Sequence, residues 1–130
     1  DAVIEELFLT NVLGPLFLLR RVVPALAQRR GFVAQISAVV AEQPLPGMAP
    51  YAASKAALTA ADKALTRELR RSGVDVNDIR PPHTETGLAG RPLAGTAPTL
   101  PQGLDPDAVA STILDAIEAG RSELASTDFA

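Results

Sequence analysis

Hydrophobic and polar residues follow two different periods along the chain. Over long segments apolar residues recur every three or four positions, which is the spacing of a helix face. Between these segments, short apolar runs bounded by glycine or polar residues are typical of buried strands. The pattern predicts helices over about 2–29 and 50–72, a last helix after Asp105, strands over 31–37 and 74–79, and a weaker edge strand over 122–125.

The last helix carries clear signals at both ends. Asp105 is a candidate N-cap, Pro106 suits the first helical position, and Gly120 suits the C-terminal stop. The spacing of its apolar residues predicts a buried side made of Ala110, Ile113, Leu114 and Ile117.

The order strand, helix, strand predicts an α/β fold. Two strands joined through a helix are expected to be parallel, and parallel strands are normally buried on both faces within a larger sheet. With 130 residues, of which 47% are hydrophobic, the chain has room for one domain with a single core. Because only two or three strands are predicted, we expect residues 1–130 to form one partial domain.

Composition narrows the classes of partner. The net charge of −3, with no long Lys/Arg run, argues against nucleic acid, because phosphate binding needs a concentrated positive face. The longest apolar run, about 12–19, contains Gly14 and Pro15 and is far shorter than a bilayer span, so no membrane partner is expected. The chain has no cysteine and no signal-peptide pattern, which favours a cytoplasmic protein without disulfides. No cluster of metal ligands stands out, so no metal is expected.

The segment Tyr51-Ala-Ala-Ser-Lys55 carries the strongest chemical signal. Residues four apart on a helix are neighbours, so the ammonium of Lys55 is expected near the hydroxyl of Tyr51, where it would favour the ionised form. Lowering the pKa of a tyrosine from ~10 to ~7 takes roughly 4 kcal/mol, which requires a positioned cation and burial. The pair predicts an acid/base tyrosine; the alternative is an amphipathic tyrosine beside a solvated lysine.

Four sequence features follow one another in a fixed order. They are Thr10-Asn11-Val12, a strand followed by Tyr51-x-x-x-Lys55, then Val76-Asn77, and last Pro81-x-x-x-x-Thr86. This order resembles the short-chain dehydrogenase/reductase family over nearly the whole chain. The resemblance implies the C-terminal half of a Rossmann-type domain, a doubly wound three-layer α/β/α fold with parallel strands. It also implies that the N-terminal βαβ half is missing, because no glycine-rich dinucleotide turn is present.

The resemblance assigns roles to three of these residues. Tyr51 would exchange a proton with the substrate oxygen, and Lys55 would lower the pKa of that tyrosine and bind the nicotinamide ribose. Asn11 would hold a water molecule through its main-chain carbonyl. Pro15 has no N–H, so a helix running through it leaves that carbonyl without its usual partner. The alternative is that Gly14 and Pro15 only kink a long helix.

The catalytic serine of the family is not matched. It lies thirteen residues before the tyrosine, where this chain has Ala38. Ser37 is adjacent, but neighbouring residues of a strand point to opposite faces, so Ser37 substitutes only if the strand end is bent or bulged. Losing one donor to a developing oxyanion costs ~10²–10³ in rate. The chain is therefore expected to be a slowed or an inactive enzyme.

The cofactor loop is also altered. By resemblance, Pro81 and Thr86 match the loop that binds nicotinamide, and Thr84 would offer a main-chain N–H to the carboxamide. Pro82 replaces a glycine, which puts close backbone approach in doubt because proline fixes φ and removes a donor. Asp78 is unexpected in a central strand, where an unpaired carboxylate is costly. His83, the only histidine, is interpreted as a surface residue.

Three hypotheses follow. The preferred one is a short-chain oxidoreductase, using NAD or NADP on a small-molecule alcohol or carbonyl substrate. The second is a non-catalytic relative kept for assembly, a homo-oligomer through the helices around 2–29 and 50–72, where Ala53, Ala57 and other small residues favour close packing. The third is a remnant that does not fold alone, because strands are missing.

Overall fold

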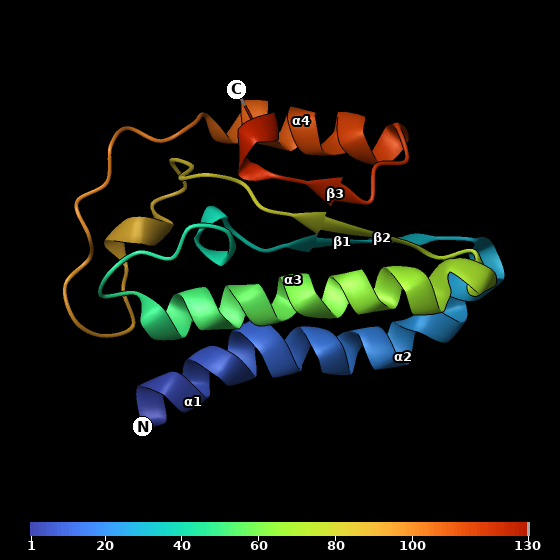
Figure 1. The fold of residues 1–130 in the computed structure, drawn as a ribbon, viewed down its shortest axis with the longest axis horizontal. Helices are drawn as coiled ribbons and strands as arrows, with labels where there is room; N and C mark the ends of the chain where they lie inside the picture. The colour runs from blue at the N-terminus through green and yellow to red at the C-terminus, as the bar shows by residue number, and fades with distance from the viewer. Residues whose placement is uncertain (130) are drawn as a thin grey trace.

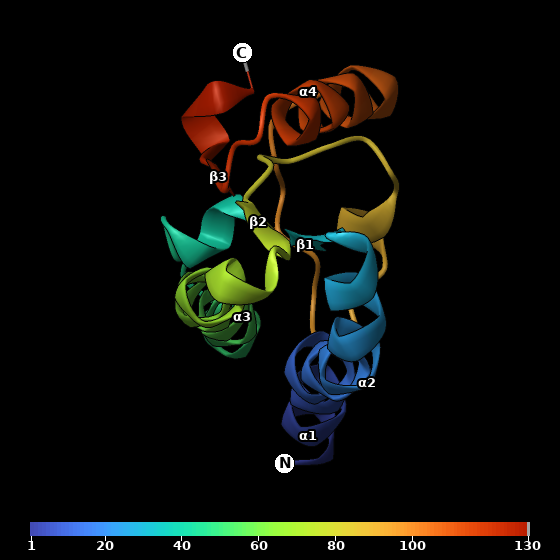
Figure 2. The ribbon, with the colours of Figure 1, turned by 90° about the vertical axis from the view of Figure 1, so that its right-hand side faces the viewer.

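The computed structural model describes residues 1–129, which form a three-stranded sheet between two layers of helices (Figures 1 and 2). All strands are parallel, in the order β1-β2-β3. The predicted α/β fold is thereby confirmed. The elements are α1 (Ala2–Phe8), a wide helical turn (Leu9–Leu13), α2 (Gly14–Arg29), β1 (Phe32–Ile36), α3 (Ala49–Leu69), β2 (Asp75–Ile79), α4 (Pro106–Glu118) and β3 (Glu123–Leu124).

The predicted helix over about 2–29 is confirmed, and it continues through Gly14 and Pro15. The turn before it widens, and the Gly14 N–H donates to the carbonyl of Leu9, five residues back. A wider turn of this kind accommodates a proline that cannot donate to the residue four positions earlier. By length and composition alone, the whole helical segment Ala2–Arg29 could cross a membrane, but core helices and signal sequences pass the same test.

The hydrophobic core lies between α4 and the β2–β3 side of the sheet. Its buried members are Ile79, Val109, Ala116, Leu124 and Phe129. The predicted buried side of α4 is wrong in part, because Val109 and Ala116 face the sheet while Leu114 is exposed. The end signals of this helix are confirmed: the Asp105 carboxylate accepts from the Asp107 and Ala108 N–H groups, each at 3.0 Å.

The sheet is held in register by its central strand. Ser37 N–H donates to the Ile79 carbonyl (2.7 Å) on the β1 side, and Arg80 N–H donates to the Leu124 carbonyl (2.9 Å) on the β3 side. The side chain of Asn77 donates to the carbonyl of Arg121, just before β3. The weak prediction of a third strand is confirmed, over two residues.

Candidate active site

The first turns of α3 carry Tyr51 and Lys55, at the end of the sheet where the strands finish. The two side chains are neighbours, as the helix spacing predicts, since the Lys55 Nζ lies 5.9 Å from the centroid of the Tyr51 ring; the expected approach of the ammonium to the Tyr51 hydroxyl stays a prediction. The ammonium sits over the ring and donates to the main-chain carbonyl of Ile36 at 3.1 Å. In this structure Lys55 therefore joins α3 to the end of β1.

The pKa values of both side chains move in the direction that burial imposes. Burial raises the pKa of the Tyr51 hydroxyl above its usual value of 10.0 and lowers the pKa of the Lys55 ammonium. The expected lowering of the tyrosine pKa by Lys55 is thus not found in this structure. The physical reason is that desolvation disfavours each charged form, while the ammonium is held by the Ile36 carbonyl.

Asn11 lies beside the turn of α3 that carries Tyr51. Its side-chain amide donates to Ser54 Oγ at 3.1 Å, and Ser54 Oγ donates to the Tyr51 carbonyl at 2.7 Å. Ser54 is fully buried, so this chain of hydrogen bonds fixes α1–α2 against α3. The role of the Asn11 main-chain carbonyl as a water ligand stays a prediction.

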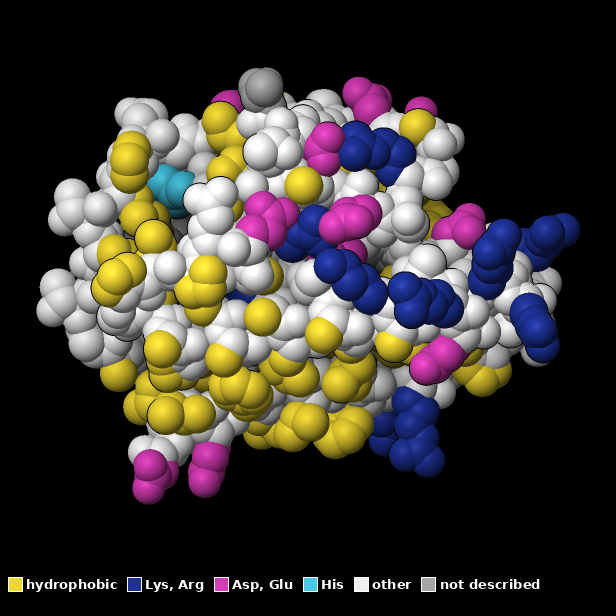
Figure 3. Space-filling model, in the orientation of Figure 1, with side chains coloured by type: hydrophobic (Ala, Val, Ile, Leu, Met, Phe, Trp, Pro, Cys, Tyr) yellow, Lys and Arg dark blue, Asp and Glu magenta, His cyan; other side chains and the backbone are white. Residues whose placement is uncertain are grey.

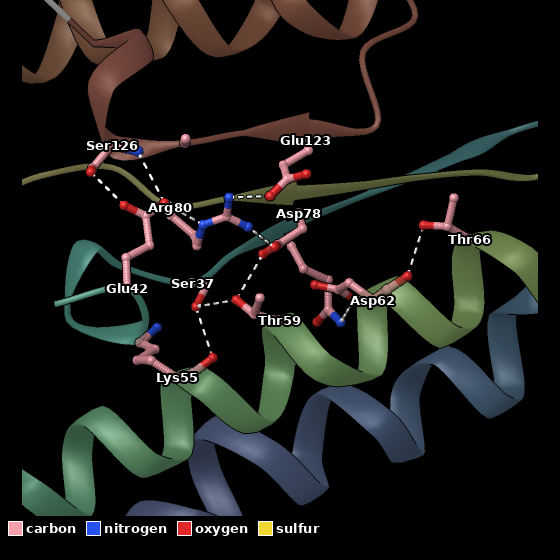
Figure 4. Close-up of polar contacts among 12 residues, drawn as sticks. Ser37, Glu42, Lys55, Thr59, Asp62, Thr66, Asp78, Arg80, Glu123 and Ser126 are labelled. Atoms are coloured by element: carbon pink, nitrogen blue, oxygen red, sulfur yellow. Dashed lines mark hydrogen bonds and ion pairs between the residues drawn. The ribbon is translucent and has the colours of Figure 1, made fainter. Parts of the chain in front are cut away.

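Ser37 points onto α3. Its buried hydroxyl donates to the carbonyl of Lys55 at 2.9 Å and lies 3.3 Å from Thr59 Oγ1 (Figure 4). Because its proton is used within the fold, the structure does not support Ser37 as a replacement donor to substrate. Ala38 follows with extended dihedral angles (φ −168°, ψ 161°), and its methyl group supplies no donor.

The loop after β2 lies at the same end of the sheet. The carbonyl of Pro81 accepts from the Val39 N–H at 3.0 Å, which ties this loop to the one that follows β1. Thr84 Oγ1 donates to the Pro82 carbonyl at 3.0 Å. Thr86 is exposed, and its hydroxyl accepts weakly from the Leu88 N–H at 3.4 Å. The four predicted loop residues are therefore at the expected end of the sheet.

His83 closes this loop. Its Nε2 lies 3.3 Å from the Glu85 carboxylate, which also accepts from the Gly103 N–H at 2.6 Å. The Leu104 N–H donates to the His83 carbonyl at 2.8 Å, forming a short parallel bridge at Thr84. These contacts tie His83 into the fold, and its side chain, interpreted from the sequence as a surface residue, is 27% exposed.

Arg80 forms a charged cluster that the sequence did not predict. Its guanidinium, 5% exposed, contacts the carboxylates of Glu42, Asp78 and Glu123 (Figure 4). Asp78, unexpected in a central strand, is not left unpaired, because Arg80 donates to it and it also accepts from Thr59 at 3.1 Å. Burial nevertheless raises the pKa of Asp78 despite the opposing effect of Arg80. The sequence did contain a signal for the contact between Asp78 and Arg80, because residues two apart on a strand point to the same face of the sheet.

A groove of about 390 Å³ opens beside Lys55. Its walls come from α2, β1 and α3, and include Gly14, Leu18, Ile36, Lys55 and Leu58. A smaller pocket of about 250 Å³ lies near the Arg80 cluster, between α3 and the chain before β3, and its lining includes Asp62 and Glu123. Within residues 1–129, no three His, Asp or Glu side chains are arranged to hold a metal ion.

The residues beside Tyr51 fit the nicotinamide end of a dinucleotide in part. An ammonium has three donors, and the hydrogen bonds described for Lys55 use one of them, so others are available to ribose hydroxyls. Pro82 offers no N–H to the carboxamide, and Ala38 offers no hydroxyl to a substrate oxygen. The tyrosine and lysine therefore fit the cofactor better than the loop does.

Comparison with known proteins gives a consistent result. Residues 1–94 match the family model described as short chain dehydrogenase. The chain is 28% identical over 121 residues to 17-beta-hydroxysteroid dehydrogenase 13 of Rattus norvegicus, covering 90% of this chain and 39% of that protein. It is 32% identical over 127 residues to dehydrogenase/reductase SDR family member 7B of Bos taurus, covering 92% and 39%.

Solved structures agree with this similarity. A short-chain dehydrogenase from Streptomyces avermitilis superimposes with a TM-score of 0.80 at 27% identity, over 97% of this chain and 55% of that one. One from Sphingobium yanoikuyae, in complex with NADPH, gives a TM-score of 0.79 at 28% identity, over 88% and 45%. The chain thus spans about two fifths of the curated relatives it matches and about half of these structures.

Proposed function

Because the chain belongs to the short-chain dehydrogenase family, we propose that it carries the proton-transfer residues of an NAD(P)-dependent oxidoreductase. The reaction would move hydride between nicotinamide and a small-molecule alcohol or ketone. The observation that carries the proposal is the position of Tyr51 and Lys55 on one face of α3, with Asn11 tied to the same turn. We further propose that the chain corresponds to the C-terminal half of the family domain.

Each residue of this site has a separate task. Tyr51 binds the substrate oxygen and moves the proton at its hydroxyl, while the bound nucleotide supplies or accepts the hydride. Lys55 binds ribose hydroxyls, and its charge favours the tyrosinate form once the ammonium leaves the Ile36 carbonyl. Asn11 holds the helical segment 2–29 against α3 through Ser54.

NADPH is the first cofactor to test. Two similar structures, from Sphingobium yanoikuyae and Burkholderia cenocepacia, are complexes with NADPH and NADP. A nucleotide that binds only the folded chain stabilises it by about 2.7 kcal/mol at a hundredfold excess over its Kd. We expect NADPH to raise the midpoint of a cooperative melt followed by circular dichroism, with NADH compared in parallel.

Two lysines of α3 provide a matched control for this melt. Lys55→Met should abolish the shift, whereas Lys63→Met, at an exposed position two turns along the same helix, should keep it. A cooperative melt that neither nucleotide moves would contradict cofactor binding. A melt without a cooperative transition would favour the third hypothesis, a chain that does not fold alone.

Catalysis is expected to be slow because position 38 has no hydroxyl. Ala38→Ser should raise the rate of NADPH oxidation by ~10²–10³, the usual contribution of one oxyanion donor. Bulky ketones are suitable first substrates, since a structure 25% identical to this chain is that of a bulky-bulky ketone specific alcohol dehydrogenase from Comamonas testosteroni. Tyr51→Phe in the same background should remove the activity.

A non-catalytic assembly role is the second candidate. Exposed Leu9, Leu13 and Phe17 follow one another at a spacing of four residues, and Figure 3 shows hydrophobic side chains gathered over α1 and α2. Such a stripe favours a homo-oligomer through the helices around 2–29 and 50–72. Sedimentation should then show a dimer that Phe17→Glu dissociates. If Ala38→Ser gives no activity while this dimer is present, the assembly role is the better account.

A further inference from the structure

The turn that follows β1 joins two positions of the candidate active site. Ala38, which lacks the expected hydroxyl, begins a 3-10 turn over Val39–Ala41, and Glu42 ends it. The Glu42 N–H donates back to the Val39 carbonyl at 2.9 Å. The chain then runs through mostly exposed residues to α3, whose first turn carries Tyr51. A shift of this turn would therefore move position 38 and the start of α3 relative to each other.

The side chain of Glu42 ties this segment to distant parts of the chain. Its carboxylate accepts from Arg80 Nε at 2.5 Å, and from the N–H and hydroxyl of Ser126 at 3.2 and 2.5 Å (Figure 4). The other hydrogen bonds described for residues 42–50 join residues no more than four apart. The segment that leads to Tyr51 is thus anchored to the rest of the fold mainly through one carboxylate.

Arg80 is itself fixed before it reaches Glu42. Its remaining guanidinium nitrogens donate to the carboxylates of Asp78 and Glu123. A guanidinium is planar and presents its donors in a rigid fork, so these two contacts determine the direction of Nε. The main chain is held as well, since the Arg80 N–H donates to the Leu124 carbonyl at 2.9 Å. The end of β2 therefore presents an oriented donor to Glu42.

The contact between Arg80 and Glu42 joins two charged groups. Burial opposes ionisation of Glu42, but hydrogen bonds from Arg80 and Ser126 hold its pKa below the usual value. Hydrogen bonds between ionised groups are roughly twice as strong as neutral ones. The Arg80 side chain is 5% exposed and that of Glu42 is 23% exposed, which limits screening by solvent. This contact is therefore stronger than the local main-chain bonds of the turn.

We propose that Arg80 and Glu42 form a positioning pair for the candidate active site, completed by Ser126 from the C-terminal segment. The pair holds the turn at 38–42 against the end of β2, so that position 38 and the start of α3 keep a fixed separation. Both residues act through the main chain that they hold. The effect on catalysis rests on the proposed function, whereas the holding of the turn does not.

A role in stability alone would make the carboxylates of the cluster equivalent. Glu42 and Glu123 contact the same guanidinium, but they hold different elements. Glu42 lies in the turn that leads to Tyr51, and Glu123 lies on β3, away from the candidate site. The two glutamates therefore separate positioning of the site from general stabilisation of the sheet.

Amide hydrogen exchange measured by NMR on the whole chain tests the pair. Glu42→Gln keeps the length of the side chain and an accepting oxygen but removes the charge, and Glu123→Gln makes the same change on β3. The reporter is the amide of Gln43, which donates to the Val39 carbonyl at 2.8 Å. We expect it to exchange at least tenfold faster in Glu42→Gln and less than twofold faster in Glu123→Gln.

Two further measurements separate local from global effects. Urea unfolding of both variants gives their loss of global stability, so that exchange beyond this loss reports the turn itself. Ser126→Ala is a milder change that removes one donor to Glu42 and leaves the contacts of Arg80 in place. It should speed exchange of the Gln43 amide at least threefold, and it keeps the test available if Glu42→Gln does not fold.

Kinetics in the Ala38→Ser background connect the pair to the candidate site. Glu42→Gln should lower kcat for NADPH-dependent ketone reduction at least tenfold, while Glu123→Gln lowers it less than twofold. The KM for NADPH should stay within twofold in both variants, because Lys55 is held by the Ile36 carbonyl and not by the turn. A general loss of stability would not separate kcat from KM in this way.

Equal exchange of the Gln43 amide in the two Gln variants, after correction for global stability, would overturn the positioning pair. Exchange that neither Glu42→Gln nor Ser126→Ala changes would overturn it as well. If exchange follows the prediction but Ala38→Ser shows no activity, the pair still holds the turn and the proposed function fails. If both Gln variants lose kcat equally despite different exchange, the connection of the pair to the site is wrong.

Discussion

The two edges of the sheet differ sharply in how they are covered. Ile79 on β2 and Ile36 on β1 are register partners, yet Ile79 is 1% exposed and Ile36 is 47% exposed. On the β3 side, α4 and Leu124 bury the sheet. On the β1 side, a groove takes the place of a neighbouring element. The burial of side chains is therefore concentrated toward β3, while the β1 side is left open.

The Arg80 cluster explains much of the closed edge. One guanidinium joins β2 to Glu42 in the loop after β1 and to Glu123 on β3. Glu42 in turn accepts from the Ser126 hydroxyl at 2.5 Å. Segments far apart in sequence are thus held together by one buried cation.

Removing that cation should give the largest loss of stability. Arg80→Leu leaves Asp78 and two further carboxylates without their shared partner, and breaking a buried ion pair costs about 3–5 kcal/mol. Urea unfolding measures the effect, with Arg71→Leu at an exposed position as the control. Equal stability of the two variants would show that the cluster does not hold the closed edge.

The register partners Ile79 and Ile36 test whether the two sides of the sheet differ in burial. Ile79→Ala should cost about 2–5 kcal/mol because it opens a cavity in the core between β2 and α4. Ile36→Ala, at the open edge, should cost less than about 1 kcal/mol, as is usual for exposed positions. Both free energies of unfolding come from urea titrations, and similar values would mean that the β1 edge is already covered.

Asp62 on α3 is expected to make the stability of the chain depend on pH. Burial raises the pKa of its carboxyl from 3.8 to about 6, against the hydrogen bond that Gln35 donates. The folded chain thus binds this proton more tightly than the unfolded chain, so stability falls as pH rises from about 4 to about 6. The change amounts to about 3 kcal/mol, from 1.36 kcal/mol per pKa unit.

Asp62→Asn isolates this contribution from the other titrating groups. The amide oxygen can still accept from Gln35, and it carries no charge. The variant should be more stable than the parent by up to about 3 kcal/mol at pH 7, and the difference should vanish near pH 4. A difference that stays constant over this range would place the titration on another group.

The smallest predicted effect concerns the helix that covers the closed edge. Asp105→Ala removes the oxygen that caps two N–H groups of α4, at a cost of about 1 kcal/mol. Asp107 lies in the first turn of α4, but its side chain does not cap the helix, so Asp107→Ala should cost less. Thermal melts of the two variants provide the comparison. If Asp105→Ala matches Asp107→Ala, the cap contributes little to α4.

Local signals in the sequence predicted most of the fold. The start of the last helix at Asp105, the end of the second helix near residue 72, the two longer strands and the placement of Tyr51 beside Lys55 all follow from spacing and capping. The buried side of α4 was missed in part, because the stripe through Val109 and Ala116 is chosen by the sheet it packs on.

Long-range contacts account for what the sequence did not reveal. The Arg80 cluster joins residues as far apart as Glu42 and Glu123, which no local pattern brings together. The direction of the Lys55 side chain is set by the Ile36 carbonyl on another element. Helix spacing therefore predicted that Lys55 lies beside Tyr51, but the lowered tyrosine pKa expected from it is not found, because burial raises that pKa.

The most direct test of the account is a titration of Tyr51, the only tyrosine in a chain without tryptophan. A ¹³Cζ-tyrosine label followed by NMR reports its pKa without interference from other residues. We predict a pKa raised above its usual value in the chain alone, because burial raises it, and a lower pKa with saturating NADPH, a change that Lys55→Met abolishes. A pKa that neither NADPH nor NADH changes would contradict the role of Tyr51 as the acid/base of a dehydrogenase.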